Sequence, residues 1–354
     1  MSTTTVPVSA PTDRTDQSSA ALSQRMAQLL SGFQQAQALY ACAKLDIATA
    51  LVDGPLPLVE LAAATGTEQT ALNRLLRFLC GIDVVRQRDD GMFVVTPFGA
   101  TLAAGTPGSV RDLAIFWMET HYEAFGDLIT TVRTGVTAFD VHFGQPLGDW
   151  LADKPEHVAG LVGAMNGVAR WIKSDLLDGY VLPPGAVVAD IGGADGTLVA
   201  SLLADDPTRR GIVFDLPHVV TAAHNLLAER DLVDRVEVVG GDFFRSVPAA
   251  DVYVLSTVLH DWDDERCARI LGSIAAAARP GAHLVVLEAV VPDGNEPHPA
   301  RFNDLTMLGM ASGRERTRDE YAELFAAAGF TISQCISGPK HNPFSILEAT
   351  SGQL

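Results

Sequence analysis

The sequence predicts a doubly wound α/β domain in its C-terminal half, preceded by a mainly helical winged-helix domain. From residue 186 onward, short apolar runs alternate with helical stretches, which is typical of a buried parallel sheet. A glycine-rich turn, Gly192–Thr197, follows the first of these runs. The length of 354 residues favours two domains over one.

Five apolar runs are predicted to be the strands of this sheet, because strands buried on both faces read as continuous apolar segments. They are Val187–Asp190, Gly211–Asp215, Val236–Val239, Val252–Leu255 and Leu284–Glu288. Pro183-Pro184-Gly185 is a boundary signal, so this domain is expected to span residues 183–354.

The N-terminal half predicts a winged-helix domain over residues 20–108, after a disordered Ser/Thr/Pro-rich tail over residues 1–19. Helices are expected over residues 58–64 and 67–79, the second with Thr67 as its N-cap. Two strand-like segments, 84–86 and 93–95, are joined by Asp90-Gly91, a hairpin signal. Helix-turn-helix folds often bind DNA, but a formal net charge of −18 disfavours nucleic acid and anionic membranes as partners.

Two helical regions flank this compact block. Residues 20–51 carry apolar side chains at helical spacing: Leu22, Met26, Leu29, Leu30, Phe33 and Tyr40. Two interpretations of this pattern stay open, a core helix pair and a contact between subunits. Residues 109–182 are predicted to be linking helices that contribute to a substrate pocket. Most of their aromatic residues are expected in the core and some at that pocket: Phe116, Trp117, Tyr122, Phe125, Phe139, Phe143, Trp150 and Trp171.

Cysteine usage and hydropathy favour a cytoplasmic location. The cysteines at 42, 80, 267 and 335 form no CxxC pair, so reduced thiols are expected rather than a zinc ribbon or redox motif. The first 20 residues lack the apolar segment of a signal peptide. No apolar run reaches the roughly 18 residues that a membrane span requires.

The turn Asp190-Ile-Gly-Gly-Ala-Asp-Gly-Thr197 follows the first strand, where open α/β sheets bind ligands. Its glycines let the backbone turn tightly and approach a ligand closely. The turn fails the dinucleotide fingerprint GxGxxG, because Gly192 would require glycines where Ala194 and Thr197 stand. A nicotinamide cofactor, and with it a dehydrogenase, is therefore disfavoured.

Acidic residues after the next two strands predict an adenosine-containing ligand instead. Asp215 ends the second strand, where a carboxylate can accept hydrogen bonds from both ribose hydroxyls. Gly241-Asp242-Phe243 follows the third strand. Asp242 can accept from an exocyclic amine there, and Phe243 can flank the adenine ring.

His260 follows the fourth strand, on the same sheet edge as the glycine-rich turn. With an unperturbed pKa of about 6.5, imidazole is a competent general base near neutral pH. Two carboxylates are expected to orient it: Glu288, at the end of the fifth predicted strand, and Glu315, in Gly313-Arg-Glu-Arg-Thr317. A carboxylate on Nδ1–H leaves Nε2 free to take a proton.

These residues resemble the small-molecule S-adenosylmethionine-dependent O-methyltransferases of the plant phenolic and bacterial natural-product type. That family pairs a winged-helix dimerisation domain with a class I methyltransferase domain, a Rossmann-like doubly wound sheet. The resemblance covers roughly residues 20–350. It rests on Asp190–Gly196, Phe214–Val219, Gly241–Phe244, Leu259–Asp264, Leu287-Glu288 and Arg314–Thr317.

The resemblance implies that His260 accepts the proton and that Glu288 and Glu315 frame it. The residues it implies at the cofactor are Asp190, Gly192, Gly193, Gly196, Asp215, Leu216, Gly241, Asp242, Phe243, Ser256 and Trp262. Those it implies at the acceptor substrate are Met165, Asn303, Met307 and Met310. The chain departs from the family at Ala194, usually glycine, where a small side chain is expected to fit. It departs again at Ser256, where plant members carry lysine, and this weakens that part of the cofactor assignment.

The predicted function is methyl transfer from S-adenosyl-L-methionine to a hydroxyl of an aromatic or polyketide-like small molecule in secondary metabolism. The protein is expected to be a homodimer without a metal ion. His298, in a turn-rich segment, is a disfavoured candidate metal ligand. Three alternatives stay open: a nitrogen or activated-carbon acceptor such as a heterocycle or α-keto acid, a non-methylating homologue, and a ligand-sensing winged-helix regulator.

Overall fold

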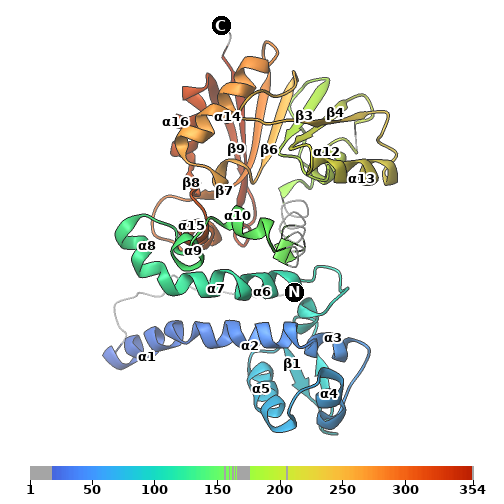
Figure 1. The fold of residues 1–354 in the computed structure, drawn as a ribbon, viewed down its shortest axis with the longest axis vertical. Coiled ribbons are helices and arrows are strands. Elements are labelled where there is room, and N and C mark those ends of the chain that lie inside the picture. The colour runs from blue at the N-terminus through green and yellow to red at the C-terminus, as the bar shows by residue number, and fades with distance from the viewer. Residues whose placement is uncertain are drawn as a thin grey trace, which may run out of the picture. The chain divides into compact units, whose positions relative to one another are not determined.

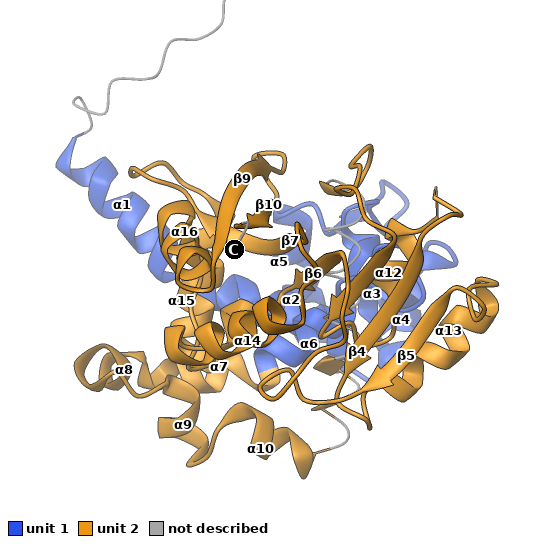
Figure 2. Ribbon diagram, turned by 90° about the horizontal axis from the view of Figure 1, so that it is seen from above, with its two compact units in different colours: residues 1–118 blue, residues 119–354 orange. Residues whose placement is uncertain are grey.

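The computed structural model describes residues 18–154, 157–158, 160–161, 163, 165, 176–204 and 206–352. The chain forms two compact units that divide between Met118 and Glu119 (Figure 2). The predicted linking helices at 109–182 fall on both sides of this division. Residues 1–17 of the predicted tail and Trp171, one of the aromatic residues expected in the core or at the pocket, lie outside the described residues.

The first unit consists of helices and a two-stranded wing (Figure 1). Its elements are α1 (Ser19–Leu30), α2 (Gly32–Lys44), α3 (Ile47–Val52), α4 (Leu58–Thr65), α5 (Gln69–Gly81), β1 (Val85–Gln87), β2 (Phe93–Val95) and η1 (Gly99–Leu102). β1 and β2 pair antiparallel, and Gly91 between them has a φ of 80°. The predicted hairpin is therefore confirmed.

Helix α5 begins later than the sequence predicted, and Thr67 as its N-cap is wrong. Glu68 is the N-cap, because its carboxylate accepts the backbone N–H of Thr70 at 2.8 Å and that of Ala71 at 2.7 Å. Two bonds to a charged acceptor are stronger than the one that a threonine hydroxyl offers. The Thr67 hydroxyl lies 2.9 Å from that of Thr65 instead.

The apolar side chains of α1 and the start of α2 lie on the surface of the chain. Five of them are between 51% and 70% exposed: Leu22, Met26, Leu29, Leu30 and Phe33. A core helix pair would bury them, so this exposure favours the subunit-contact interpretation.

The second unit begins with short helices. They are α7 (His121–Ala124), η2 (Phe125–Asp127), α8 (Leu128–Thr134), α9 (Ala138–Phe143) and α10 (Leu147–Ala152), while α6 (Arg111–Glu119) ends just past the division. The rings of Phe139, Phe143 and Trp150 pack with centroids 4.4–5.7 Å apart. Tyr122, in contrast, is 39% exposed, and Trp117, near the end of the first unit, is 43% exposed.

A mixed sheet of eight strands organises the second unit (Figure 1), in the order β5-β4-β3-β6-β7-β10-β9, with β8 beside β7. The strands are β3 (Val187–Ile191), β4 (Arg210–Asp215), β5 (Val236–Gly240), β6 (Val252–Ser256), β7 (His283–Val291), β8 (Arg316–Thr317), β9 (Phe330–Ser337) and β10 (Phe344–Ser351). All five predicted strands are present and pair in parallel. The antiparallel edge of β10 and β9 was not predicted.

Helices cover both faces of this sheet, which confirms the doubly wound architecture. α14 (Asp264–Ala277) and α16 (Arg318–Ala327) pack on one face, where Ile191 and Leu255 point. α12 (Thr197–Leu202) and α13 (Ala223–Glu229), preceded by η3 (Val220–Ala222), pack on the other, where Val188 and Val254 point. Burying each such side chain stabilises the fold by roughly 1.5–3 kcal/mol. Among the described residues, no helix has the length and apolarity that crossing a bilayer would take.

Candidate active site

The carboxyl ends of β3, β4, β5 and β6 bring the predicted cofactor residues to one edge of the sheet. β3 lies between β4 and β6 in parallel register, and β5 lies beside β4. The glycine-rich turn after β3 is therefore flanked by Asp215, the last residue of β4, and by Ser256, the last residue of β6. The segment at Gly241 follows β5 at the same edge.

The glycine-rich turn depends on close backbone approach. A Cβ on Gly192 would lie 2.7 Å from Val258 Cγ2, and one on Gly193 would lie 2.9 Å from Cγ of the buried Asp190. Gly192 and Gly196 also have φ values of 76° and 74°, which favour glycine. The turn is thus packed directly against the segment that leads to His260.

Ala194 adopts a left-handed backbone, with a φ of 44°. The small side chain was predicted to fit the available space, but that prediction did not consider the backbone conformation. A left-handed conformation costs a non-glycine residue on the order of 1–2 kcal/mol. Asp215 holds the strained turn, because its Oδ2 accepts the Ala194 N–H at 3.0 Å and its Oδ1 accepts the Leu216 N–H at 2.7 Å. Leu216 itself is 44% exposed.

Aromatic rings line the edge beyond β5 and β6. The ring of Trp262 lies 6.2 Å from that of Phe243 and 4.9 Å from that of Phe244, measured between centroids. Asp242 Oδ1 accepts the Phe244 N–H at 2.9 Å, and this bond fixes the backbone that carries the two phenylalanine rings. A Cβ on Gly241 would lie 2.5 Å from the Phe214 ring, so only glycine fits there.

His260 lies in η4 (Leu259–Asp261), a short turn after β6. Its Nδ1 is 3.0 Å from Oε1 of Glu315, whose side chain is only 1% exposed, whereas the imidazole is 18% exposed. Its Nε2 lies 3.5 Å from Oδ1 of Asp261. The turn begins at Thr257, which has a φ of 52°, so the chain enters it through a strained residue.

Glu288 was predicted to end its strand, and this is wrong. β7 continues to Val291, and Glu288 pairs with Ser345 of β10 in its interior. Its Oε1 accepts the backbone N–H of Val258 at 3.0 Å and that of Leu259 at 2.8 Å. The two predicted orienting carboxylates thus differ in what they contact: Glu315 holds the imidazole, and Glu288 holds the turn that carries it.

Charge around His260 decides its protonation. Burial alone would lower the pKa of His260, but the negative charges of Glu288, Asp261 and Glu315 outweigh it and raise this pKa to about 10. Burial raises the pKa of Glu288 to about 7, although His260 and the two backbone N–H groups oppose the shift. The imidazole is therefore protonated at neutral pH unless another positive charge comes close.

Donor atoms of His260, Glu288 and Glu315 lie within 4.8 Å of one another, a spacing that a metal ion can also use. The 3.0 Å separation of Nδ1 and Oε1 is that of a hydrogen bond, so we interpret the cluster as one that shares protons. His298 is not in this cluster. It is the N-cap of α15 (Pro299–Met310), where its Nδ1 accepts the Ala300 N–H at 3.3 Å.

The predicted acceptor residues lie mainly on α15. Met307 and Met310 are buried, at 8% and 4% exposure, and Asn303 is half-buried. Met165 is 46% exposed, and most of its neighbours in the chain lie outside the described residues.

Comparison with known proteins settles the family. The family model for the O-methyltransferase domain matches residues 125–331, and that for the O-methyltransferase dimerisation domain matches residues 27–105. This chain belongs to the O-methyltransferase family. It is 41% identical to the phenazine O-methyltransferase PhzM of Lysobacter antibioticus, over 93% of this chain and 96% of that protein.

Two further relatives bear on the chemistry of this O-methyltransferase. The 8-amino-8-demethylriboflavin N,N-dimethyltransferase of Streptomyces davaonensis is 37% identical, over 91% of this chain and 93% of that protein. The SAH-bound structure of CalO1, a methyltransferase in calicheamicin biosynthesis, is 33% identical with a TM-score of 0.84, covering 95% of this chain and all of that one. The predicted family, fold class, methyltransferase activity and S-adenosylmethionine cofactor are confirmed.

Arg316 is a residue of this O-methyltransferase that the sequence analysis missed. Its side chain is buried, with 1% exposure, and it donates to the backbone carbonyl of Leu259 at 3.1 Å and to that of Trp262 at 2.8 Å. The Arg314–Thr317 motif was recognised from the sequence, but nothing in the sequence indicated that Arg316 is buried or that it contacts the η4 turn.

Proposed function

We propose that this O-methyltransferase methylates a hydroxyl of an aromatic or polyketide-like small molecule in secondary metabolism, with His260 as general base. The observation that supports this most directly is the 3.0 Å contact between Nδ1 of His260 and the buried carboxylate of Glu315. Such a contact fixes the tautomer and leaves Nε2 as the nitrogen that takes a proton. The phenazine O-methyltransferase relative supports an aromatic acceptor.

The residues at the sheet edge fit S-adenosylmethionine. Each oxygen of Asp215 accepts one backbone N–H, so each keeps acceptor capacity for a ribose hydroxyl. Asp242, Phe243 and Trp262 form a polar and aromatic corner suited to adenine. The cofactor supplies an electrophilic methyl group on a positively charged sulfur, and the carboxylates around His260 favour such a charge.

The protein's part in the reaction is to position the acceptor and to move one proton. A phenol with a pKa of about 10 is a weak nucleophile until its proton leaves. His260 Nε2 would take that proton, and Glu315 would stabilise the imidazolium that forms. The bound cofactor would supply the methyl group, whose bond to sulfur breaks as the phenolic oxygen takes it, leaving S-adenosylhomocysteine. Alignment of the reacting atoms can contribute about 7–11 kcal/mol in favourable cases.

Cofactor affinity is expected to depend on pH through His260. With its pKa raised to about 10, His260 is positively charged near neutral pH and repels a sulfonium. S-Adenosylmethionine binding should therefore release a proton and tighten as pH rises, by up to about tenfold per pH unit, until the pKa of His260 is reached. S-Adenosylhomocysteine, whose sulfur is uncharged, should show little of this dependence.

Calorimetry with both ligands checks this, at several pH values and in buffers of different ionisation enthalpy. Proton release with S-adenosylmethionine alone is the expected result. An equal pH dependence for the two ligands would place the titrating group away from the sulfur.

The proposed acceptor is tested by incubating the protein with methyl-labelled S-adenosylmethionine and a panel of phenols, arylamines, N-heterocycles and α-keto acids. Mass spectrometry and NMR then assign the methylated atom. Transfer to phenolic oxygen is the expected outcome, and transfer only to nitrogen or carbon would reject it. The N,N-dimethyltransferase relative favours an amine as the second candidate acceptor, and the same panel distinguishes the two.

We infer that the working form is a homodimer, and that a second copy of the chain covers the apolar face of α1 and α2. The dimerisation-domain match at residues 27–105 and the exposure of Leu29, Leu30 and Phe33 support this. Light scattering at micromolar concentration should give about twice the chain mass of 37.6 kDa. A stable monomer would contradict it. The cytoplasmic location and the lack of a nucleic-acid partner stay predictions.

A further inference from the structure

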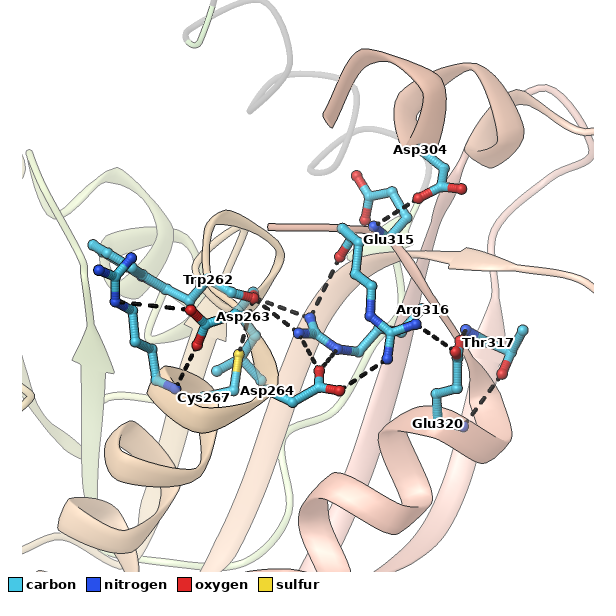
Figure 3. Close-up of polar contacts among 12 residues, drawn as sticks. Trp262, Asp263, Asp264, Cys267, Asp304, Glu315, Arg316, Thr317 and Glu320 are labelled. Carbon is cyan, nitrogen blue, oxygen red and sulfur yellow. Dashed lines mark hydrogen bonds and ion pairs between the residues drawn. The ribbon is translucent and has the colours of Figure 1, made fainter. Parts of the chain in front are cut away.

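Besides Glu288 and Cys267, the segment Gly313–Thr317 contacts the turn that carries His260. Arg316 donates from Nη1 to the carbonyl of Leu259 at 3.1 Å and from Nη2 to that of Trp262 at 2.8 Å. These carbonyls lie at the two ends of η4, one residue before His260 and two after it. Figure 3 shows the guanidinium of Arg316 reaching Asp264 and the start of α14 from β8.

We propose that Arg316 is a positioning residue for the methyl-transfer reaction, which sets the place of His260 and of Trp262 relative to the sheet. This rests on the proposed role of His260 as base. A guanidinium suits the task, because its donors form a rigid planar fork. Here the fork reaches the two carbonyls of the turn, the carbonyl of Arg314 at 3.4 Å and the Asp264 carboxylate, whose Oδ1 accepts from Nε at 3.0 Å and from Nη2 at 2.7 Å.

The position of Arg316 is itself fixed by the sheet. Its backbone pairs in parallel with Val290 at the end of β7, and Thr317 pairs with Val291. Thr317 then begins α16 with a capping box, in which Glu320 accepts the Thr317 N–H at 2.7 Å (Figure 3). Through β8, the guanidinium therefore links the η4 turn to β7, the strand that also carries Glu288.

The same segment holds the imidazole through the adjacent residue. Glu315 contacts Nδ1 of His260. Its own backbone N–H donates to Asp304 Oδ1 at 3.2 Å, as Figure 3 shows. Gly313 lies so close to the turn that a Cβ there would be 1.8 Å from the His260 carbonyl oxygen. Neighbouring residues thus fix the ring and its backbone together, and both would move if Arg316 let the turn shift.

Burying a guanidinium is costly unless it is paired and fully hydrogen-bonded. The Arg316 side chain is 1% exposed, whereas that of its partner Asp264 is 58% exposed. A turn that needed only stability could be closed by apolar packing. A buried charge with directed bonds to both ends of the turn instead supports a role in precise placement.

Arg314 provides a matched control. It is two residues away and also binds Asp264, through Nη2 at 3.0 Å, but its side chain is 46% exposed. Its other side-chain partner is Glu320, and the structure gives it no bond to the η4 carbonyls. Arg314→Lys and Arg314→Met therefore perturb the same ion-pair network without touching the turn.

The test compares Arg316→Lys and Arg316→Met with these controls. A misplacement of about 1 Å can cost on the order of 10²-fold in rate, so we expect kcat to fall about 10–100-fold in the Arg316 variants, with a smaller change in acceptor KM. The Arg314 variants should stay within about twofold. Arg316→Lys keeps the charge and the Asp264 pair, so it carries the test if Arg316→Met does not fold.

A double-mutant cycle with His260→Asn separates positioning from stability. If Arg316 acts through His260, Arg316→Lys should lower the residual rate of the His260→Asn protein by less than about threefold. An equal loss in both backgrounds, or wild-type kcat in folded Arg316→Lys protein, would overturn the proposal. Failure of the base assignment looks different: His260→Asn alone would then keep its turnover.

Discussion

Replacing His260 by asparagine should lower kcat by about 10²–10⁴-fold, the usual contribution of general-base catalysis. The asparagine amide can still donate to Glu315 in place of Nδ1–H, so the turn and the buried carboxylate keep a partner. The variant then has no basic atom at the position of Nε2, so nothing there can accept the proton of the acceptor. Affinity for S-adenosylhomocysteine, measured by calorimetry, should change little, because the ribose and adenine contacts proposed for Asp215, Asp242 and Phe243 are untouched.

His298→Asn is the matched control for this change. His298 caps α15 by accepting the Ala300 N–H, and asparagine is a favourable N-cap. The control should fold and turn over like the wild type. Near-normal kcat in the His260 variant, or an equal loss in the His298 variant, would mean that the imidazole of His260 is not the base.

The sheet was largely predictable because strands buried on both faces carry a strong local signal. All five continuous apolar runs proved to be parallel strands. β9 was not predicted because it mixes apolar residues with exposed polar residues, such as Ser333 and Gln334, as edge strands do. Glu288 was misread as a strand end for a related reason: a carboxylate is rare in a strand interior, and its partners are backbone groups of a distant turn.

The site was predictable as a location but not as a set of contacts. Carboxyl ends of neighbouring parallel strands must meet at one edge, so the sequence could bring the glycine-rich turn, Asp215 and His260 together. Which carboxylate contacts the imidazole depends on how the backbone turns at Thr257, which has a left-handed conformation. A glycine would have indicated such a conformation in the sequence, but this residue is a threonine. The bonds of Arg316 are to carbonyls, which every residue has, so no sequence pattern could reveal them.

Gly313→Ala should have the second largest effect, since it adds one methyl group where backbone already stands. The new Cβ would lie 1.8 Å from the His260 carbonyl oxygen, 2.4 Å from the Asp261 carbonyl carbon and 2.6 Å from the Trp262 nitrogen. None of these atoms can rotate away as a side chain would, so the turn must move. Overpacking of this kind costs typically about 1–3 kcal/mol of stability, and a shift of about 1 Å at the base can cost about 10²-fold in kcat.

Gly272→Ala, in α14, is the control, because a Cβ there meets nothing within 4 Å and the residue is in a helix, where alanine is favoured. Thermal unfolding and kcat are measured for both variants. The Gly272 variant should be as stable as the wild type or more so, with unchanged turnover. If Gly313→Ala also kept wild-type stability and kcat, Gly313–Thr317 would not lie against the η4 turn, and the positioning roles of Glu315 and Arg316 would both fail. A loss in kcat that exceeds the loss in stability would instead show that the close approach serves placement of His260 more than folding.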